Sequence, residues 1–130
     1  MDMTTYLENA LVNHVVRNTA YTSPAAVYLA LWNGDPGDAG SGGTEVTTTI
    51  RAAGRLAVAF DAPSSGVTQN TAEEDFGSAD AGATVSYVAI MDAQSGGNML
   101  FNGAITGGAQ TISAGNGVSV AVGNLTITLD

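Results

Sequence analysis

The chain has 130 residues, of which 45% are hydrophobic and 12% are charged, and its formal net charge at pH 7 is -9. This length suits one domain, so we expect a single domain over residues 1–130. Twelve acidic residues stand against three arginines, and lysine is absent. This balance excludes a nucleic-acid binder, because affinity for phosphate backbones comes from clustered cations. The absence of cysteine excludes disulfides, thiol catalysis and cysteine–zinc sites.

No targeting or membrane segment is expected. The N-terminal stretch carries Asp2 and Glu8 but no basic region, which argues against a secretory signal peptide. The longest wholly apolar stretch, residues 25–32, is too short to span a bilayer. We therefore expect a soluble protein without a membrane partner.

One α-helix is predicted near the N-terminus, over residues 5–17. Thr5 and Glu8 have capping-box spacing, in which the threonine oxygen accepts a hydrogen bond from the backbone N–H of the glutamate. Arg17 in the last turn complements the negative end of the helix dipole. Apolar residues recur on one face at i, i+4 spacing, namely Leu7, Leu11 and Val15, with Ala10 and Val12 beside them.

After Pro24 the apolar period changes to two, which is typical of strands. Residues 84–92 are apolar on both faces, as a central strand would be, and Gly96 and Gly97 are expected to turn it into a hairpin. Asn116 and Gly117 are a further turn signal. In the first strand one face is predicted to carry Val27, Leu29 and Leu31, and the other face Tyr28, Ala30 and Trp32. The inward residues predicted for later strands are Leu56, Val58, Phe60, Val118, Val120, Val122, Leu125, Ile127 and Leu129, with Arg55 and Asp61 pointing outward.

The predicted fold class is mainly β. About six to eight short strands separated by glycine-rich turns indicate an antiparallel β-sandwich, jelly-roll-like, or a small barrel. The N-terminal helix is expected to pack on the sheets or to reach away to a neighbouring molecule.

The segment "NGDPGDAGSGGTEV", residues 33–46, raises the question of a metal-binding loop. An EF-hand counted from Asp35 needs oxygen ligands at its third and fifth positions, which here are Gly37 and Ala39, so that pattern fails. An irregular calcium site completed by the acidic residues 73–75 is one alternative. The favoured interpretation is a solvated connection in which Asp and Gly act as turn residues. We therefore predict no metal site.

No catalytic residues are predicted. A Ser-His-Asp arrangement would have to use His14, which lies mid-helix among apolar neighbours and is expected to be a packed or interface residue. Asp61 and Asp92 each end a predicted strand, and neither is paired with a second acid for glycoside hydrolysis. Residues 40–45 are glycine-rich but no lysine follows, so a phosphate cradle is not formed. The sequence predicts no enzyme and no cofactor.

Two polar features remain. Tyr28 and Trp32 share a strand face beside Asp35, an arrangement that would suit stacking of a sugar ring, although strand aromatics usually belong to a core or an interface. Arg51 and Arg55 are expected to pair with carboxylates, either within the chain or on a neighbouring subunit.

Four segments resemble a family of small tailed-bacteriophage virion proteins described as tail-fibre-like or minor structural proteins. These segments are "TTYLENALVNHVVRNTAYTSPAAVYLALW" (4–32), "DPGDAGSGGTEV" (35–46), "VAIMDAQSGGNMLFNGAI" (88–105) and "AVGNLTITLD" (121–130). The chain departs from the family between residues 47 and 84, where Thr49 replaces an aromatic residue. The resemblance implies a structural role in the particle, with no catalytic residues to carry over.

The strong acidity favours a position on the exterior of the virion, away from packaged DNA. The leading hypothesis is an outer capsid decoration (cement) protein, a homo-oligomer with the trimer favoured, that binds the major capsid protein with help from its N-terminal helix. Binding to the assembled shell alone would stabilise the shell. The alternatives are a tail, neck or fibre/spike-base component and a carbohydrate-binding receptor module.

Overall fold

The computed structural model of the protein describes residues 1–129, with the side chain of Thr48 excepted. The helices are α1 (Thr5–Val16) and the single turn α2 (Thr47–Ile50). The strands are β1 (Asp2–Met3), β2 (Val27–Asn33), β3 (Thr44–Glu45), β4 (Leu56–Val58), β5 (Val67–Gln69), β6 (Glu74–Ser78), β7 (Ala83–Val85), β8 (Tyr87–Met91), β9 (Met99–Ala104), β10 (Gln110–Ile112), β11 (Gly117–Val120) and β12 (Thr126–Thr128). The prediction of a mainly β protein with an N-terminal helix is confirmed.

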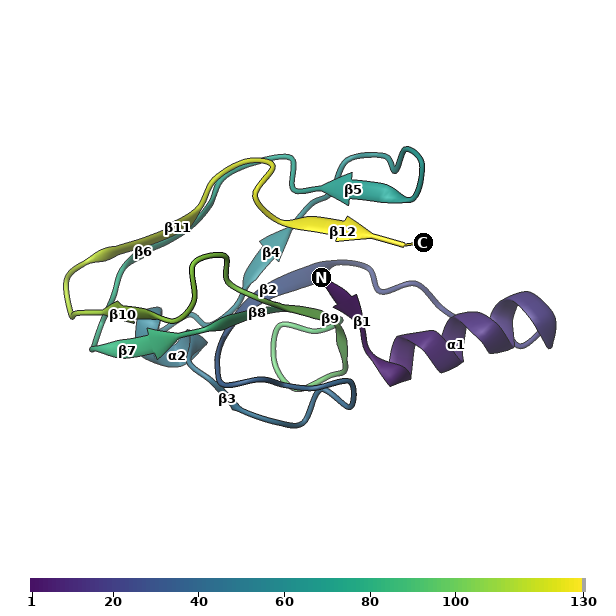
Figure 1. The fold of residues 1–130 in the computed structure, drawn as a ribbon, viewed down its shortest axis with the longest axis horizontal. Helices are drawn as coiled ribbons and strands as arrows, with labels where there is room; N and C mark the ends of the chain where they lie inside the picture. Colours follow the sequence, from purple (N-terminus) through teal and green to yellow (C-terminus); the bar gives the residue numbers. More distant parts are fainter. Residues whose placement is uncertain (130) are drawn as a thin grey trace.

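The strands form one six-stranded sheet and three two-stranded ribbons. The order in the large sheet is β1-β9-β8-β2-β3, with β4 also paired to β2, and the ribbons are β10-β7, β11-β6 and β12-β5. All pairings are antiparallel. Figure 1 shows α1 projecting away from the sheets at one end of the molecule. The layers are sandwich-like, as predicted, whereas a jelly-roll connectivity is not confirmed.

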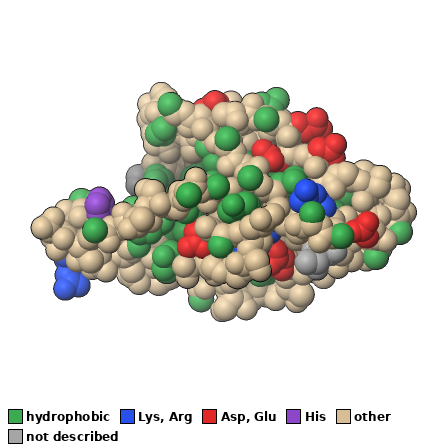
Figure 2. Space-filling model, turned by 180° about the vertical axis from the view of Figure 1, so that it is seen from behind, with side chains coloured by type: hydrophobic (Ala, Val, Ile, Leu, Met, Phe, Trp, Pro, Cys, Tyr) green, Lys and Arg blue, Asp and Glu red, His purple; other side chains and the backbone are tan. Residues whose placement is uncertain are grey.

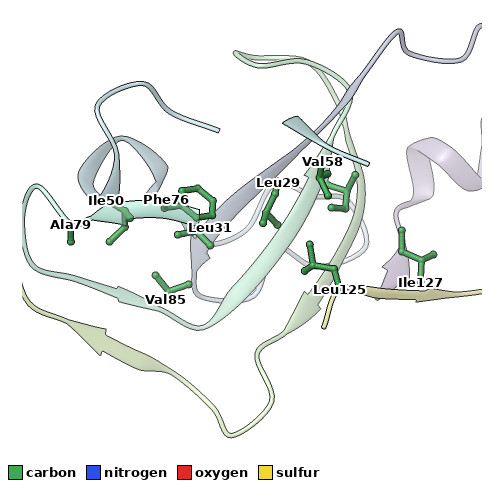
Figure 3. Packing of buried hydrophobic residues seen from close by; sticks show 10 residues of the cluster. Leu29, Leu31, Ile50, Val58, Phe76, Ala79, Val85, Leu125 and Ile127 are labelled. Atoms are coloured by element: carbon green, nitrogen blue, oxygen red, sulfur yellow. The ribbon is translucent and has the colours of Figure 1, made fainter. Parts of the chain in front are cut away.

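Strand β2 supplies side chains to two separate apolar clusters. Leu29 and Leu31 belong to the main core, whereas Ala30 and Trp32 belong to a second cluster on the opposite face. This confirms the alternation predicted for the strand. Figure 3 shows side chains of the main core meeting between the large sheet and the ribbons. The buried members of the main core are Leu29, Leu31, Ile50, Val58, Phe76, Ala79, Val85, Ile90, Leu125 and Ile127.

The N-terminus of α1 differs from the prediction. Its N-cap is Thr4, no side chain caps the helix, and the capping box at Thr5 is therefore wrong. The physical reason is that β1 pairs with β9, so that the Thr4 hydroxyl donates to the carbonyl oxygen of Met99 at 2.6 Å instead. The helix ends at Val16, and Arg17 is its C-cap residue.

The predicted apolar face of α1 is buried only where the helix begins. Leu7 is buried and Leu11 is half-buried, but Val15 is 75% exposed. The helix leaves the surface of the sheet as it proceeds, which is visible in Figure 1. Of the two arrangements expected for this helix, its first half follows the packed one and its second half projects from the body.

The predicted central strand 84–92 is two strands. Strand β7 pairs with β10, and after Ser86 the chain continues in the large sheet as β8, which lies between β2 and β9. The hairpin from β8 to β9 is confirmed, and both of its glycines have positive φ, 62° at Gly96 and 73° at Gly97. At Gly97 an added Cβ would lie 2.3 Å from a carboxylate oxygen of Asp92, so this turn requires glycine.

Three predictions of side-chain direction are wrong. Val122 is 59% exposed because it lies in the turn after β11, where Asn124 N–H donates to the carbonyl oxygen of Ala121. Leu129 is exposed because it follows the end of β12. Arg55, predicted to point outward, is buried. The inward prediction holds for Leu125 and Ile127, which are both core residues.

Replacing Leu29 tests the main core directly. Leu29→Ala is expected to lower the free energy of unfolding by about 2–5 kcal/mol, because it removes buried methyl groups and leaves a cavity. Val122→Ala, a matched change at an exposed position, is expected to alter it by about 0.5 kcal/mol or less. Urea unfolding monitored by circular dichroism measures both, and equal losses in the two variants would contradict this description of the core.

Candidate functional site

The guanidinium of Arg55 is a buried polar group, with a side chain that is 6% exposed. Its Nε donates to Oε1 of Glu45 and its Nη2 to Oε2, both at 2.9 Å. Its Nη1 donates to the carbonyl oxygens of Ala93 at 2.6 Å and Gly96 at 2.8 Å. The predicted pairing with a carboxylate is confirmed, and burial is tolerated because the planar fork of donors is matched by acceptors. The group joins β3, the start of β4 and the β8–β9 hairpin.

This contact lowers the pKa of the Glu45 carboxyl group. Burial alone would raise its pKa, but hydrogen bonds from Arg55 and Thr47, together with the positive charge of Arg55, lower the pKa below its usual value. Glu45 is therefore ionised at neutral pH. By contrast, Nη1 of Arg51 donates to the carbonyl oxygens of Gly54 and Arg55, and within residues 1–129 Arg51 forms no ion pair.

The acidic segment 33–46 folds back over Trp32. The indole N–H of Trp32 donates to the carbonyl oxygen of Gly42 at 2.8 Å. A carboxylate oxygen of Asp35 accepts from the backbone N–H of Gly37 at 2.8 Å, which is the usual turn role of aspartate. The segment therefore packs over the second apolar cluster and is not a fully solvated connection.

The described residues contain no group of three or more histidine, aspartate or glutamate side chains that could hold a metal ion. Glu45 is engaged by Arg55, and Asp35 closes its own turn. Of the acidic residues 73–75, Asp75 accepts from the backbone N–H of Gly77 in the same way. Glu74 is buried in β6, and this burial raises its pKa. The two acidic segments are not assembled into a common site.

The residues considered for catalysis have structural roles or lie in solvent. His14 is exposed, and its Nδ1 accepts from the backbone N–H of Tyr21 at 3.3 Å, so within the single chain it is not a packed residue. Asp92 accepts from the backbone N–H and the side-chain amide of Asn98, at 2.7 and 2.9 Å, and thereby closes the β8–β9 hairpin. Asp61 is exposed, and its carbonyl oxygen accepts from the hydroxyl of Thr68.

The aromatic residues of β2 do not form an open stacking platform. Trp32 is only 9% exposed and its polar atom is already bonded, which fits the core interpretation of strand aromatics. Tyr28 and Tyr87 are half-buried beside the same cluster. Burial raises the pKa of Tyr87, and the nearby Asp35 carboxylate raises it further. Burial also raises the pKa of Tyr21, with smaller contributions from Tyr6 and Asp92.

Two clefts open beside β12, and neither was predicted from the sequence. Cleft A has a volume of about 640 Å³, and cleft B has a volume of about 600 Å³. Cleft A is lined by residues that include Leu31, Val88, Ile105, Ile112, Val118 and Asn124. Cleft B is lined by residues that include Val27, Phe60, Asp61, Pro63, Phe101 and Leu129. Hairpin-like ribbons meet the large sheet from different directions, and local sequence patterns carry no signal for the gaps between them.

The second half of α1 forms another surface that the sequence analysis missed. Val12, Val15 and Val16, which we call the valine stripe, are all well exposed. Their i, i+3, i+4 spacing was the available signal for a second apolar face. As for membranes, no helix within residues 1–129 is both long and apolar enough to cross one.

A family model described as Podophage GP4 fiber I protein gp80 matches residues 2–128 of the chain. The match covers nearly the whole sequence and confirms the resemblance to structural proteins of tailed-phage virions. No curated protein matches the chain.

Removing the guanidinium of Arg55 tests how much its hydrogen bonds and ion pair stabilise the fold. Arg55→Met is expected to lower the free energy of unfolding at pH 7 by about 3 kcal/mol, because Glu45 and two carbonyl oxygens lose their donors. This value is at the low end for a buried pair because Glu45 is 28% exposed. The matched change Arg51→Met is expected to cost about 1 kcal/mol. Chemical denaturation gives both values, and a larger loss for Arg51→Met would be the contrary result.

The same comparison should depend on pH. Because the pKa of Glu45 is lower in the folded state, its stabilising contribution is complete above the unfolded pKa of about 4.3 and is lost as pH falls through the folded pKa. The difference in the free energy of unfolding between the native protein and Arg55→Met should therefore become smaller below about pH 4. A difference that stays constant between pH 7 and pH 3 would show that the ion pair contributes little.

Calcium should have no effect on the stability of the chain. Two of the three carboxylates of segment 33–46 are used, Glu45 by Arg55 and Asp35 by a local turn, and the described residues hold no group of three possible metal ligands. Thermal melting with EDTA and with millimolar Ca²⁺ should give the same midpoint. A rise with Ca²⁺ that Asp35→Asn abolishes would instead identify a cation site.

Proposed function

The chain belongs to the family described as Podophage GP4 fiber I protein gp80, and we propose that it is a non-enzymatic subunit of the fibre or tail apparatus of a tailed-phage virion. The observation that carries this proposal is the match over residues 2–128 to a family described as a fibre protein. Among the candidates derived from the sequence, the fibre-type structural role agrees with this family.

The use of polar residues in the fold supports a structural role. Arg55 and Glu45 join three segments, and Asp35 and Asp92 close the turns that follow β2 and β8. These four polar side chains are thus occupied in holding loops. What the chain leaves available is surface: the valine stripe on α1 and clefts A and B. Such surfaces suit a subunit that is held by its neighbours.

We propose further that the chain lies on the exterior of the particle, bound to other virion proteins and to copies of itself, with a trimer favoured. The net charge of -9 disfavours a surface that faces packaged DNA. Capsid decoration, with the major capsid protein as partner, makes the same demands on a small acidic β-domain. The number of copies per particle separates the two roles. A carbohydrate-binding module has less support, because Trp32 is buried.

Quantitative mass spectrometry of purified virions tests the proposal. The copy number of this chain is measured against the major capsid protein, with the other tail proteins of the same particle as low-copy references. We expect a copy number in the range of those tail proteins. A number approaching that of the capsid subunit would overturn the fibre role in favour of decoration. Absence of the chain from the virion would overturn both roles.

A further inference from the structure

The valine stripe is an apolar surface without a partner in the single chain. Val12 is 59% exposed, Val15 75% and Val16 71%. Residues spaced i, i+3 and i+4 lie on one face of a helix. Leu7, in the first half of α1, is the residue through which the helix is buried against the body. The stripe therefore remains uncovered although the helix itself is anchored.

The second half of α1 needs such a partner for its own stability. Helices shorter than about 12–15 residues are marginal in water, and most helical stability in proteins comes from packing. Valine is β-branched and a weaker helix former than leucine or alanine. The first half of α1 packs on β9, whereas the half that carries the valines projects beyond the sheets, as Figure 1 shows. Packing by a second surface would stabilise this half.

The total accessible surface agrees with an incomplete assembly. The chain exposes 6946 Å², whereas a folded monomer of its mass, 13.0 kDa, exposes about 6,300 Å². The difference is of the same order as one partner's share of a standard interface, about 800 Å². An arm that projects and clefts that stand open both add surface of this kind.

Cleft B has the chemistry to receive the stripe. Its volume is about 600 Å³. Its walls are apolar side chains such as Phe60, Pro63 and Phe101, and Asp61 is the acidic residue among its lining. Cleft A, in contrast, has no charged residue in its described lining.

Charge distinguishes the end of α1 from the rest of the molecule. Arg17 directly follows the stripe, bonds to the side chain of Asn13 at 3.2 Å, and pairs with no carboxylate in the described part of the chain. Arg51 and Arg55 donate to groups of their own neighbourhood. Figure 2 shows blue and purple side chains on the projecting arm, and red acidic side chains over the body together with blue ones. The arm is thus complementary to the acidic body of another copy.

We propose that the valine stripe of one copy docks in cleft B of the next copy, with Arg17 facing Asp61. This inference rests on the proposed function, because it specifies how the subunit is held by copies of itself. Within its own chain the stripe stays exposed, and the pairing of β1 with β9 fixes the start of the helix. The contact joins two different surfaces, so its repetition gives a ring where the rotation closes, of which the trimer is one form, and an open helical array where it does not.

Site-directed cross-linking tests the contact, because the chain contains no cysteine. Val16→Cys places a thiol on the stripe and Leu129→Cys places one at cleft B. With a short bismaleimide, a mixture of the two variants is expected to give a covalent product that contains one chain of each. Neither variant alone should cross-link. A product from Val16→Cys alone would mean that the helices pair with each other, and no product in the mixture would equally overturn the proposal.

Substitutions provide an independent readout by sedimentation of the purified protein. The native chain is expected to self-associate, and Val15→Gln with Val16→Gln is expected to weaken this association at least tenfold. Glutamine is as good a helix former as valine, so circular dichroism should show α1 retained. The matched control is Val122→Gln, at an equally apolar and exposed position outside both surfaces. A native chain that stays monomeric at high concentration, or an equal loss with Val122→Gln, would contradict the proposal.

A charge exchange completes the test. Arg17→Glu is expected to weaken association, and adding Asp61→Arg is expected to restore it, because the pair is rebuilt with reversed signs. If the second substitution does not restore association, Arg17 does not face Asp61 and the proposed contact is contradicted. These measurements use the purified chain, so their failure is distinct from failure of the virion copy number, which tests the proposed function itself.

Discussion

Burial of strand β2 on both faces is the constraint on which the rest of the structure depends. A strand that is apolar on two sides needs a cover on each. The ribbons cover Leu29 and Leu31, and the acidic segment 33–46 folds over Trp32 on the other side. The backbone N–H of Leu31, between the stretches of β2 that pair with β3 and β4, finds its acceptor in the buried hydroxyl of Thr47. The short helix α2 thereby completes the sheet.

The second cover is an acidic, glycine-rich segment held by local contacts. Arg55 binds Glu45 and extends to the carbonyl oxygens of the β8–β9 hairpin, and Asp35 closes its own turn. At Gly43 an added Cβ would lie 2.7 Å from the Trp32 ring, so glycine there allows the close approach of the segment to the indole. The glycine content of segment 33–46 and its packing on Trp32 thus have one physical cause, the close approach of the backbone to the indole.

Local pattern was sufficient where a residue's environment follows from its immediate neighbours. The alternation in β2, the hairpin at Gly96 and Gly97, and the existence of α1 are examples. Pattern failed where a partner far along the chain decides the outcome. Arg55 is buried because acceptors at three distant positions surround it, and the Thr4 hydroxyl turns to β9 instead of capping α1. The clefts and the exposed valine stripe depend on how whole elements meet, which no local period records.

The chain belongs to a family of phage fibre proteins, and the features that remain on its surface agree with the proposed role as a subunit. Its fold uses charge internally and leaves an apolar arm and an apolar cleft exposed. An asymmetric cryo-EM reconstruction of the virion tests this most directly. We expect density for this fold in the tail or fibre apparatus, with α1 of each copy lying against the body of the next. Density repeated over the capsid lattice, or an α1 that points into solvent, would contradict it.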